Sequence, residues 1–393
     1  MDRESVKAKI DIQKVIFSLL FSSYQLFGMS LTYLFLIIYI FYTWFLEKKS
    51  FLVLDKGFLF FLMVVLMHEV IMLFMQGSEA KTILNNIIGG IITVAIIGTL
   101  SIRIDLEKLK KAYYIIAIIV SIGILYHAVL VYGLGRAVTP IKLIPALISD
   151  SIQWERGLMR PMSCFIEPQA YCTFMVPVIF FLLNDKKIVW AALGTGCILL
   201  STSSLGIIMC VIMWLFLLLD SKVSRGMKIC IIFCGVMALA VILQSPIFHY
   251  AINKIRNIDT SSDARLSQGF IIYRQMPHVD QIFGIGKRSL VSYILDHNIY
   301  VPRMRYATNA GKWSYVTTIA GMCIYYGVVG IFAFLFFTLT QLKKKNFLIK
   351  EFLILLVAIS FGQAMLFSAP FIQFYTILFC LDKDRSHFIR LDF

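Results

Sequence analysis

The chain has 393 residues, of which 59% are hydrophobic, and a formal net charge of +15. Its mean hydropathy is +0.83, which excludes an ordinary soluble domain with about 45–50% apolar residues. Apolar runs recur along the whole chain, and runs of about 17–25 residues can cross a ~30 Å hydrocarbon core. Only helices and closed barrels satisfy their backbone groups in lipid, and the alternating pattern of barrel strands is missing from the sequence. We therefore expect an all-α polytopic membrane protein.

The predicted spans begin with residues 15–46, which are too long for one crossing. Ser22, Ser23 and Gly28 interrupt this run and indicate a helical hairpin. Ten further spans are expected at 57–76, 83–101, 112–132, 168–183, 188–202, 204–219, 229–244, 314–339, 350–367 and 370–381. The sequence therefore predicts about 12 transmembrane helices.

Short basic connectors set the predicted orientation of these spans. They lie at 103–111, 184–187, 221–228, 343–345 and 383–385. With twelve spans, all five fall on the side of the N-terminus, so both termini are expected in the cytoplasm. Much of the net positive charge is then explained by lysines and arginines that anchor the spans on the cytoplasmic side. No nucleic-acid-binding motif is visible, so nucleic acid is not an expected partner.

Two longer segments are expected on the outer side, at residues 133–166 and 245–312, in a chain (1–393) that otherwise forms a single integral membrane domain. The second segment carries nine Lys and Arg against four Asp, a formal charge of about +5. Loops of this length escape the positive-inside rule, so the charge is compatible with an outer location. A large cationic extracytoplasmic loop favours an anionic substrate.

The first candidate site is the stretch Arg160-Pro161-Met162-Ser163-Cys164-Phe165-Ile166-Glu167-Pro168, at the outer end of a predicted span. Proline suits the first turn of a helix, and the helix dipole favours a carboxylate at the N-terminal end. Glu167 and Arg160 can therefore form a cap and a nearby ion pair. Alternatively, they face a substrate at the membrane surface.

The second candidate lies around Arg265 and Arg274, on a helix that Ser262 or Asp263 can cap and that ends at Pro277. Its apolar stripe consists of Leu266, Phe270, Tyr273 and Met276. At about 100° per residue the two arginines point to opposite faces. They are either snorkelling side chains of an interfacial helix or bidentate phosphate ligands. A flexible turn is expected at 284–286.

Two further sites contain histidine. His297, in Asp296-His297-Asn298, is either a general base or an ordinary surface residue. His68 and Glu69 lie in the middle of a predicted span, where ionisable groups are usually paired inside the bundle, so a structural or relay role is expected. The sequence has no P-loop, zinc-type His/Cys set, nucleophile elbow or dinucleotide fingerprint, and neither a metal nor a cofactor is expected.

Four stretches resemble the O-antigen polymerase and ligase superfamily, also called the Wzy-type family. Residues 160–168 resemble its Arg-x-x-Ser-x-Phe-x-Glu-Pro stretch, and Leu200-Ser201-Thr202-Ser203-Ser204-Leu205-Gly206 resembles its Thr-x-Ser-Arg-x-Gly turn, with Ser204 in place of the arginine. Arg265 followed by Phe283-Gly284-Ile285-Gly286 resembles its outer-loop arginine and glycine turn. His297-Asn298 with Tyr326-Gly327-Val328-Val329-Gly330 resembles its His-Asn before a glycine-rich span.

This resemblance implies a GT-C-like repeat-unit polymerase in the bacterial cytoplasmic (inner) membrane. Its substrate would be an undecaprenyl-pyrophosphate-linked glycan, which is already activated and needs neither ATP nor a metal. Arg160 and Arg265, with Arg274 as a further candidate, would bind the pyrophosphate, and Glu167 or His297 would be the base. Its partners would be the lipid bilayer and the flippase and chain-length regulator of the same pathway.

Three alternatives remain open, and the weakest is a plain structural membrane subunit, which would not need a cationic outer loop. The O-antigen ligase uses the same donor, so the loops do not separate it from a polymerase. A lipid-linked oligosaccharide flippase also has about twelve spans, but it should carry charge along a central cavity and often shows two similar halves. The concentration of charge in one outer loop favours an outer-face enzyme.

Overall fold

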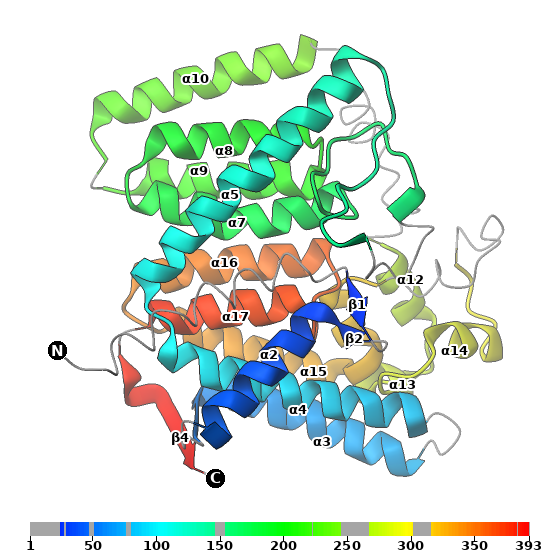
Figure 1. The fold of residues 1–393 in the computed structure, drawn as a ribbon. Coiled ribbons are helices and arrows are strands. Elements are labelled where there is room, and N and C mark those ends of the chain that lie inside the picture. The colour runs from blue at the N-terminus through cyan, green and yellow to red at the C-terminus, as the bar shows by residue number, and fades with distance from the viewer. Residues whose placement is uncertain are drawn as a thin grey trace. The chain divides into compact units, whose positions relative to one another are not determined.

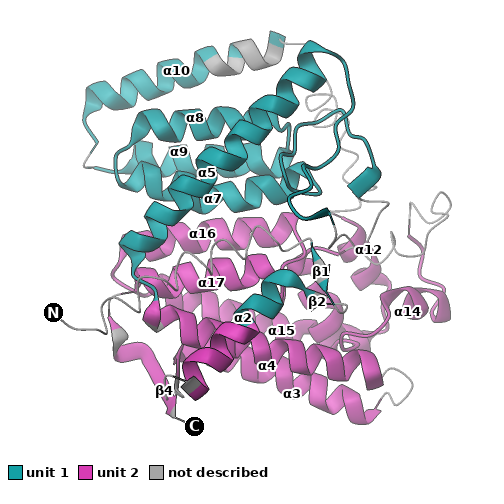
Figure 2. Ribbon diagram, viewed as in Figure 1, with its two compact units in different colours: residues 1–36, 104–257 teal, residues 37–103, 258–393 magenta. Residues whose placement is uncertain are grey.

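The computed structural model describes residues 24–26, 29–46, 51–75, 80–145, 154–221, 223–244, 267–301, 316–382 and 384–392. These residues are mostly helical, with four short strands (Figure 1). The chain forms two compact units (Figure 2). Unit 1 comprises residues 1–36 and 104–257, and unit 2 comprises residues 37–103 and 258–393.

Unit 1 is built mainly from five helices. They are α5 (Leu106–Ala128), which continues as the π-helix η3 (Val129–Gly133), α7 (Pro168–Asn184), α8 (Ile188–Leu200), α9 (Ser204–Leu219) and α10 (Arg225–Gln244). Strands β1 (Gln25–Leu26) and β2 (Met29–Ser30) form a hairpin before α2 (Leu31–Phe41), within which the chain passes from unit 1 to unit 2.

Helix α7 is the central element of unit 1. Its sequence is apolar on every side, and nearly all of its residues from Pro168 to Leu183 are buried, as expected of a helix surrounded by other helices. It packs against α5, α8 and α9. The approach of α9 is close at Gly206, where an added Cβ would meet the Cys172 Sγ at 2.5 Å. The small residue therefore sets the α7–α9 packing.

The described part of unit 2 is built mainly from five longer α-helices and three short ones. The longer helices are α3 (Lys56–Met75), α4 (Ala80–Arg103), α15 (Thr318–Leu342), α16 (Phe347–Gly362) and α17 (Ala369–Leu381). The short ones are α12 (Gln268–Gln275), α13 (His278–Phe283) and α14 (Leu290–Asp296). Strand β3 (Phe51–Asp55) pairs antiparallel with β4 (Phe388–Asp392) in the register Val53↔Arg390.

Aromatic side chains form the core of unit 2. The Phe58 ring lies 5.7 Å from Phe337, 4.7 Å from Tyr375 and 5.0 Å from Phe379, which joins α3, α15 and α17. Aromatic pairs at such distances contribute beyond their buried area.

One end of unit 2 is closed by a buried ion-pair network. The Lys344 Nζ lies 2.8 Å from an Asp55 oxygen and 2.6 Å from an Asp382 oxygen. The predicted connectors 343–345 and 383–385 therefore begin at the same end of this unit.

The predicted spans after the hairpin all correspond to helices. Their ends agree with the observed helices to within six residues. Within the described part of the chain, four helices have the length and composition to cross a membrane: Lys56–Met75, Ala80–Ser101, Leu106–Gly133 and Thr318–Leu342. Five more apolar helices are shorter, at 10–17 residues. Twelve crossings are not confirmed. Residues 15–23 and Gly28 of the predicted helical hairpin lie outside the described residues, and the described residues at its predicted break form the strands β1 and β2 instead of helix.

Candidate functional site

Arg160 is held at one end of unit 1 by the turn between α8 and α9. Its Nε donates to the Thr202 Oγ1 at 3.0 Å, and its Nη2 donates to the Thr202 carbonyl at 2.7 Å. The two stretches, separated by 42 positions, therefore lie in direct contact. The guanidinium is half-buried, and these two bonds fix its orientation.

The backbone around Arg160 is strained. Thr202 has a φ of 52° and Ser163 a φ of 56°, in the left-handed region that non-glycine residues rarely adopt. The turn also starts α9, because the Ser203 hydroxyl accepts from the Gly206 N–H. Such conformations cost about 1–3 kcal/mol each and cluster at functional sites. This end of unit 1 therefore fits a binding role.

Glu167 is the N-cap residue of α7, as the sequence predicted, with Pro168 in the first turn. Its side chain makes no capping hydrogen bond and is exposed. An exposed carboxylate at a helix N-terminus is stabilised by the dipole. Glu167 and Arg160 thus belong to the same loop of unit 1.

In unit 2, the turn 284–286 packs onto α15 instead of forming a loose connection. The N–H groups of Ile285 and Gly286 donate to the Ile324 and Tyr325 carbonyls at 3.1 and 2.9 Å. These carbonyls lie in α15 just before Gly327, whose φ of 59° and ψ of −156° interrupt the helix. The kink frees helix carbonyls, and the turn supplies donors to them.

Glycine is required on both sides of this contact. A Cβ at Gly284, where φ is 77°, would meet the Tyr325 carbonyl oxygen at 2.3 Å. A Cβ at Gly327 would meet the Ile282 carbonyl oxygen at 2.3 Å and the Gly284 nitrogen at 2.6 Å. The turn 284–286 and the Gly327 kink are therefore matched, and the flexible turn of the prediction is held in place.

Lys287, the next residue, is held by its backbone. Its N–H donates to the Glu69 carboxylate at 3.1 Å, and its carbonyl accepts from the Asn86 Nδ2 at 2.8 Å. Glu69, at 1% exposure, is thus paired with a backbone donor inside the helices. Burial lowers the pKa of the Lys287 ammonium, while the negative charge of Glu69 opposes this shift. The Lys287 Nζ lies 6.0 Å from the Phe367 ring centre.

His68, the neighbour of Glu69, contacts the same loop. Its Nε2 lies 2.5 Å from the Phe283 carbonyl oxygen. The expected role of His68 and Glu69 is therefore realised within unit 2 as support for residues 283–287.

Next along the loop, Arg288 and His297 both contact the Tyr293 ring. The Arg288 guanidinium carbon lies 4.5 Å and the His297 ring 4.1 Å from the Tyr293 ring centre. The Tyr293 hydroxyl donates to Asp280 at 2.5 Å, which fixes the ring. We call Arg288, Tyr293 and His297 the stacked triad. It brings a permanent cation and an imidazole onto one aromatic platform.

The tautomer of His297 follows from its backbone contact. Its Nδ1 lies 3.1 Å from the Tyr293 carbonyl oxygen. Because a carbonyl oxygen only accepts, Nδ1 of the neutral ring carries the proton and Nε2 is the basic nitrogen. His297 is exposed and is the C-cap residue of α14.

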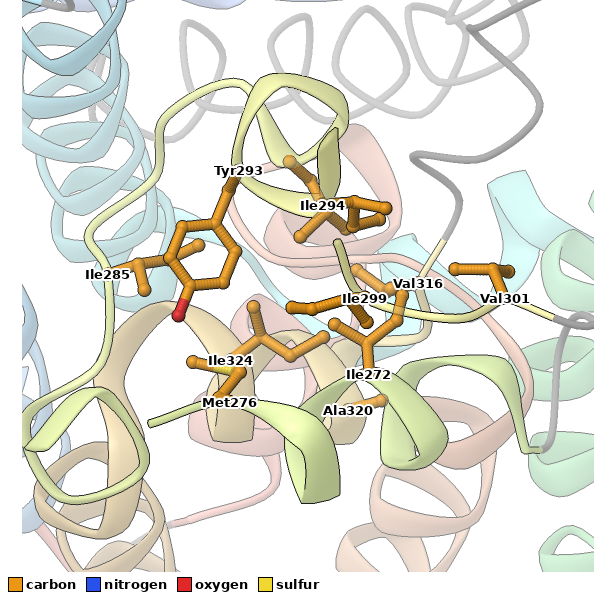
Figure 3. Close-up of a cluster of buried hydrophobic side chains, with 11 residues drawn as sticks. Ile272, Met276, Ile285, Tyr293, Ile294, Ile299, Val301, Val316, Ala320 and Ile324 are labelled. Carbon is orange, nitrogen blue, oxygen red and sulfur yellow. The ribbon is translucent and has the colours of Figure 1, made fainter. Parts of the chain in front are cut away.

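Tyr293 of the stacked triad belongs to a buried apolar cluster that joins α12, α14 and α15 (Figure 3). Ile272 of α12 and Met276, the C-cap residue of α12, pack there with Tyr293, Ile294 and Ile324. The apolar stripe predicted for the α12 region therefore packs partly against protein, since α12 contacts α15, and not only along a membrane interface. The described part of the predicted loop 245–312 is thus a folded layer.

The other predicted arginines are placed differently. Arg274 is exposed in the last turn of α12, which begins at Gln268 with Ser267 as its N-cap residue. Gln275 exchanges two hydrogen bonds with Tyr300, at 2.8 and 3.0 Å, so the chain next to Arg274 is tied to the segment after His297. Arg265 and its predicted caps Ser262 and Asp263 lie outside the described residues.

Sequence reasoning missed Lys287 and Arg288 as site residues. Their signal was a basic pair directly after the turn 284–286. The buried Nε of Arg288 has no hydrogen-bond partner within the described part of the chain, which is unusual for a buried donor. Among the described residues, no group of three or more His, Cys, Asp and Glu side chains has the arrangement of a metal site.

Comparison with known proteins leaves the family open: no protein-family model matches the chain, and no curated protein matches it.

Proposed function

We propose that the chain polymerises undecaprenyl-pyrophosphate-linked oligosaccharide repeat units into a surface polysaccharide at the outer face of the bacterial cytoplasmic membrane. The observation that carries this proposal is the stacked triad, in which Arg288 and His297 share the Tyr293 ring. Glycosyl transfer from a lipid diphosphate needs a cation for the leaving group and a base for the acceptor hydroxyl.

In the proposed reaction, an acceptor sugar oxygen attacks the anomeric carbon of the donor. The new carbon–oxygen bond forms as the bond to the diphosphate oxygen breaks, and the diphosphate leaves with the electron pair. The Nε2 of His297 takes the proton of the acceptor hydroxyl. His297 is preferred over Glu167 as the base because its Nδ1 contact with the Tyr293 carbonyl oxygen orients the ring.

The leaving diphosphate needs donors whose charge does not depend on pH. Arg288 supplies a guanidinium that lies 4.5 Å from the Tyr293 ring centre, and a guanidinium can bind phosphate oxygens bidentately. Arg160, oriented by Thr202, remains the candidate of unit 1, and Arg265 and Arg274 remain candidates of the loop. The glycan product, whether O-antigen, capsule or exopolysaccharide, is defined by the donor supplied.

The test of the activity is a gel of surface glycan from the source strain with the gene deleted and then restored. A polymerase predicts that single repeat units reach the surface while the ladder of longer chains disappears. Long chains that accumulate on the carrier lipid would instead identify a ligase. A repeat unit that never reaches the outside would identify a flippase.

The roles of the stacked triad are tested in the restored strain. His297→Ala should reduce chain formation by about 10²–10⁴-fold, the usual contribution of a general base. His278→Ala is the matched control, because His278 is an exposed histidine of the same loop and should leave the ladder unchanged. Equal ladders from both variants, at equal protein level, would remove His297 from the mechanism.

The proposed role of Arg288 is tested with one variant that keeps the positive charge and one that removes it. Arg288→Lys keeps the positive charge but loses the planar guanidinium that stacks on Tyr293 and binds phosphate bidentately. We expect Arg288→Ala to abolish the ladder and Arg288→Lys to shorten it. A ladder of normal length from Arg288→Ala would contradict the leaving-group role.

A further inference from the structure

Unit 1 contains a long apolar groove between α5, α7, α8 and α10. Its volume is about 900 Å³, in the range of ligand-binding cavities. The groove follows α8 from Lys187 to Leu200, a distance of about 20 Å at 1.5 Å per residue. Exposed apolar side chains line it, among them Ile122 at 62% and Leu193 at 58% exposure. Such a surface needs a covering partner.

The groove has a charge at one end. Lys187 is the charged residue among its described lining residues, and it lies beside Tyr114 and Trp190, which also line the groove. The Lys187 Nζ lies 4.6 Å from the Tyr114 ring centre, and Trp190 is 58% exposed. An exposed lysine next to tryptophan and tyrosine is typical of the boundary between lipid tails and headgroups.

Neighbouring lysines already neutralise the carboxylates at this end. Asp185 pairs with Lys110 at 2.7 Å, and Asp220 pairs with Lys186 at 2.6 Å. Lys187 has no carboxylate partner within the part of unit 1 that the structure describes. The apolar groove therefore ends at a cation whose charge is not compensated.

We propose that this groove binds an anionic phospholipid, with its acyl chains along α5 and α8 and its phosphate at Lys187. The lysine-rich turns of unit 1 place this end at the cytoplasmic leaflet, whose surface is negative and attracts basic side chains. This site is separate from Arg160, which contacts Thr202 beyond the other end of α8. The proposal is independent of the glycan activity.

Gly196 offers a direct way to fill the groove. It lines the groove, and a Cβ added there meets no atom within 4 Å. Gly196→Phe should therefore place its ring in the groove, in the space proposed for the lipid. Gly235→Phe is the matched control, because an added Cβ at Gly235 of α10 also meets no atom within 4 Å and Gly235 does not line the groove.

The experiment is native mass spectrometry of the purified full chain in mild detergent. Dioleoylphosphatidylglycerol is compared with dioleoylphosphatidylcholine, which has the same chains and a neutral headgroup. We expect retention of the anionic lipid on the wild-type chain and on Gly235→Phe, and its loss on Gly196→Phe. Lys187→Gln should weaken anionic lipid binding by about fivefold, the effect of one lysine near an anionic surface.

Three results would overturn the proposal. Equal retention of the two lipids would show only non-specific lipid contact. Unchanged retention on Gly196→Phe would place the lipid elsewhere. If undecaprenyl diphosphate displaced the phospholipid and Lys187→Gln did not change phospholipid binding, the groove would be assigned to a polyprenyl tail. The glycan ladder of Lys187→Gln is read separately, so failure here does not test the polymerase assignment.

Discussion

Unit 1 and unit 2 each position a cation, and they do so by different means. Unit 1 holds Arg160 by its side chain, through the two bonds to Thr202. Unit 2 holds Lys287 by its backbone, through Glu69 and Asn86. The hydrogen bonds of the Arg160 guanidinium fix the direction in which this group points. The contacts of Lys287 fix only its backbone, so its side chain can still adopt several rotamers.

The backbones that support the two cations differ in the same way. Around Arg160, unit 1 uses the non-glycine residues Ser163 and Thr202 at positive φ, whereas the turn and the kink beside Lys287 in unit 2 use Gly284, Gly286 and Gly327. Outside that turn and kink, Phe367 of unit 2 is also a non-glycine residue at positive φ. Strain of about 1–3 kcal/mol per non-glycine residue is tolerated only where surrounding contacts compensate for it. The glycines avoid that cost and permit close backbone contact. Substitutions at the two anchors should therefore have different consequences.

The largest effect is expected at the Gly327 kink. Gly327→Ala combines a positive φ with a backbone clash against Ile282 and Gly284, and it should destabilise the protein by about 4 kcal/mol. The measurement is the free energy of unfolding in SDS titration. Gly89→Ala, in α4 with no atom within 4 Å of its added Cβ, should instead stabilise by about 0.5–1 kcal/mol. Equal behaviour of the two variants would contradict the matched contact.

The next effect is at the Lys287 anchor. Glu69→Ala removes the acceptor of the Lys287 N–H and should cost about 2–3 kcal/mol, as for hydrogen bonds to charged groups. Glu69→Gln keeps one acceptor oxygen and should cost about half as much. The measurement is thermal unfolding of the two purified variants. If Glu69→Ala were as stable as Glu69→Gln, the bond from the Lys287 N–H would be ruled out as the anchor.

A smaller effect is expected at the Arg160 anchor. Thr202→Ser keeps the hydroxyl that accepts from Arg160 and relieves β-branching at positive φ, so it should be neutral or slightly stabilising. Thr202→Val keeps the side-chain shape without the acceptor and should be about 1.5–3 kcal/mol less stable than Thr202→Ser. Comparison of their unfolding midpoints tests the bond. Equal midpoints for Thr202→Ser and Thr202→Val would show that the bond from Arg160 to the Thr202 carbonyl is sufficient to hold Arg160.

The smallest effect is a pH dependence from Lys287. Burial lowers its pKa in the folded state below the 10.5 of the unfolded chain. As pH rises through the window below 10.5, the folded state releases this proton first, so stability should rise. Lys287→Met and Lys287→Arg remove a titrating amine, and both should lose this rise relative to the wild-type chain. Unfolding curves at pH 7 and pH 10 measure it, and an unchanged rise in both variants would exclude Lys287 as its source.

Much of the fold followed from local patterns. The ten helices predicted after residue 46 exist, because in lipid an apolar run of that length satisfies its backbone groups as a helix. The Glu167-Pro168 start of α7 and the end of α12 before Pro277 were also correct, since proline acts within one helical turn. The contact of Arg160 with Thr202 was not predictable from spacing, although both stretches were recognised.

The site in unit 2 required the tertiary structure for a physical reason. From the sequence, residues 284–286 were predicted to form a flexible turn, and Lys287 and Arg288 form a basic pair. Local sequence indicates only the conformational freedom and the charge of such a segment. The fixed position of these residues depends on groups up to 218 residues away, as for the Lys287–Glu69 bond. The sequence by itself determined helices, caps and the distribution of charge. Only the folded chain decided which side chains meet, as Arg288 and His297 do at the Tyr293 ring, because long-range packing selects those contacts.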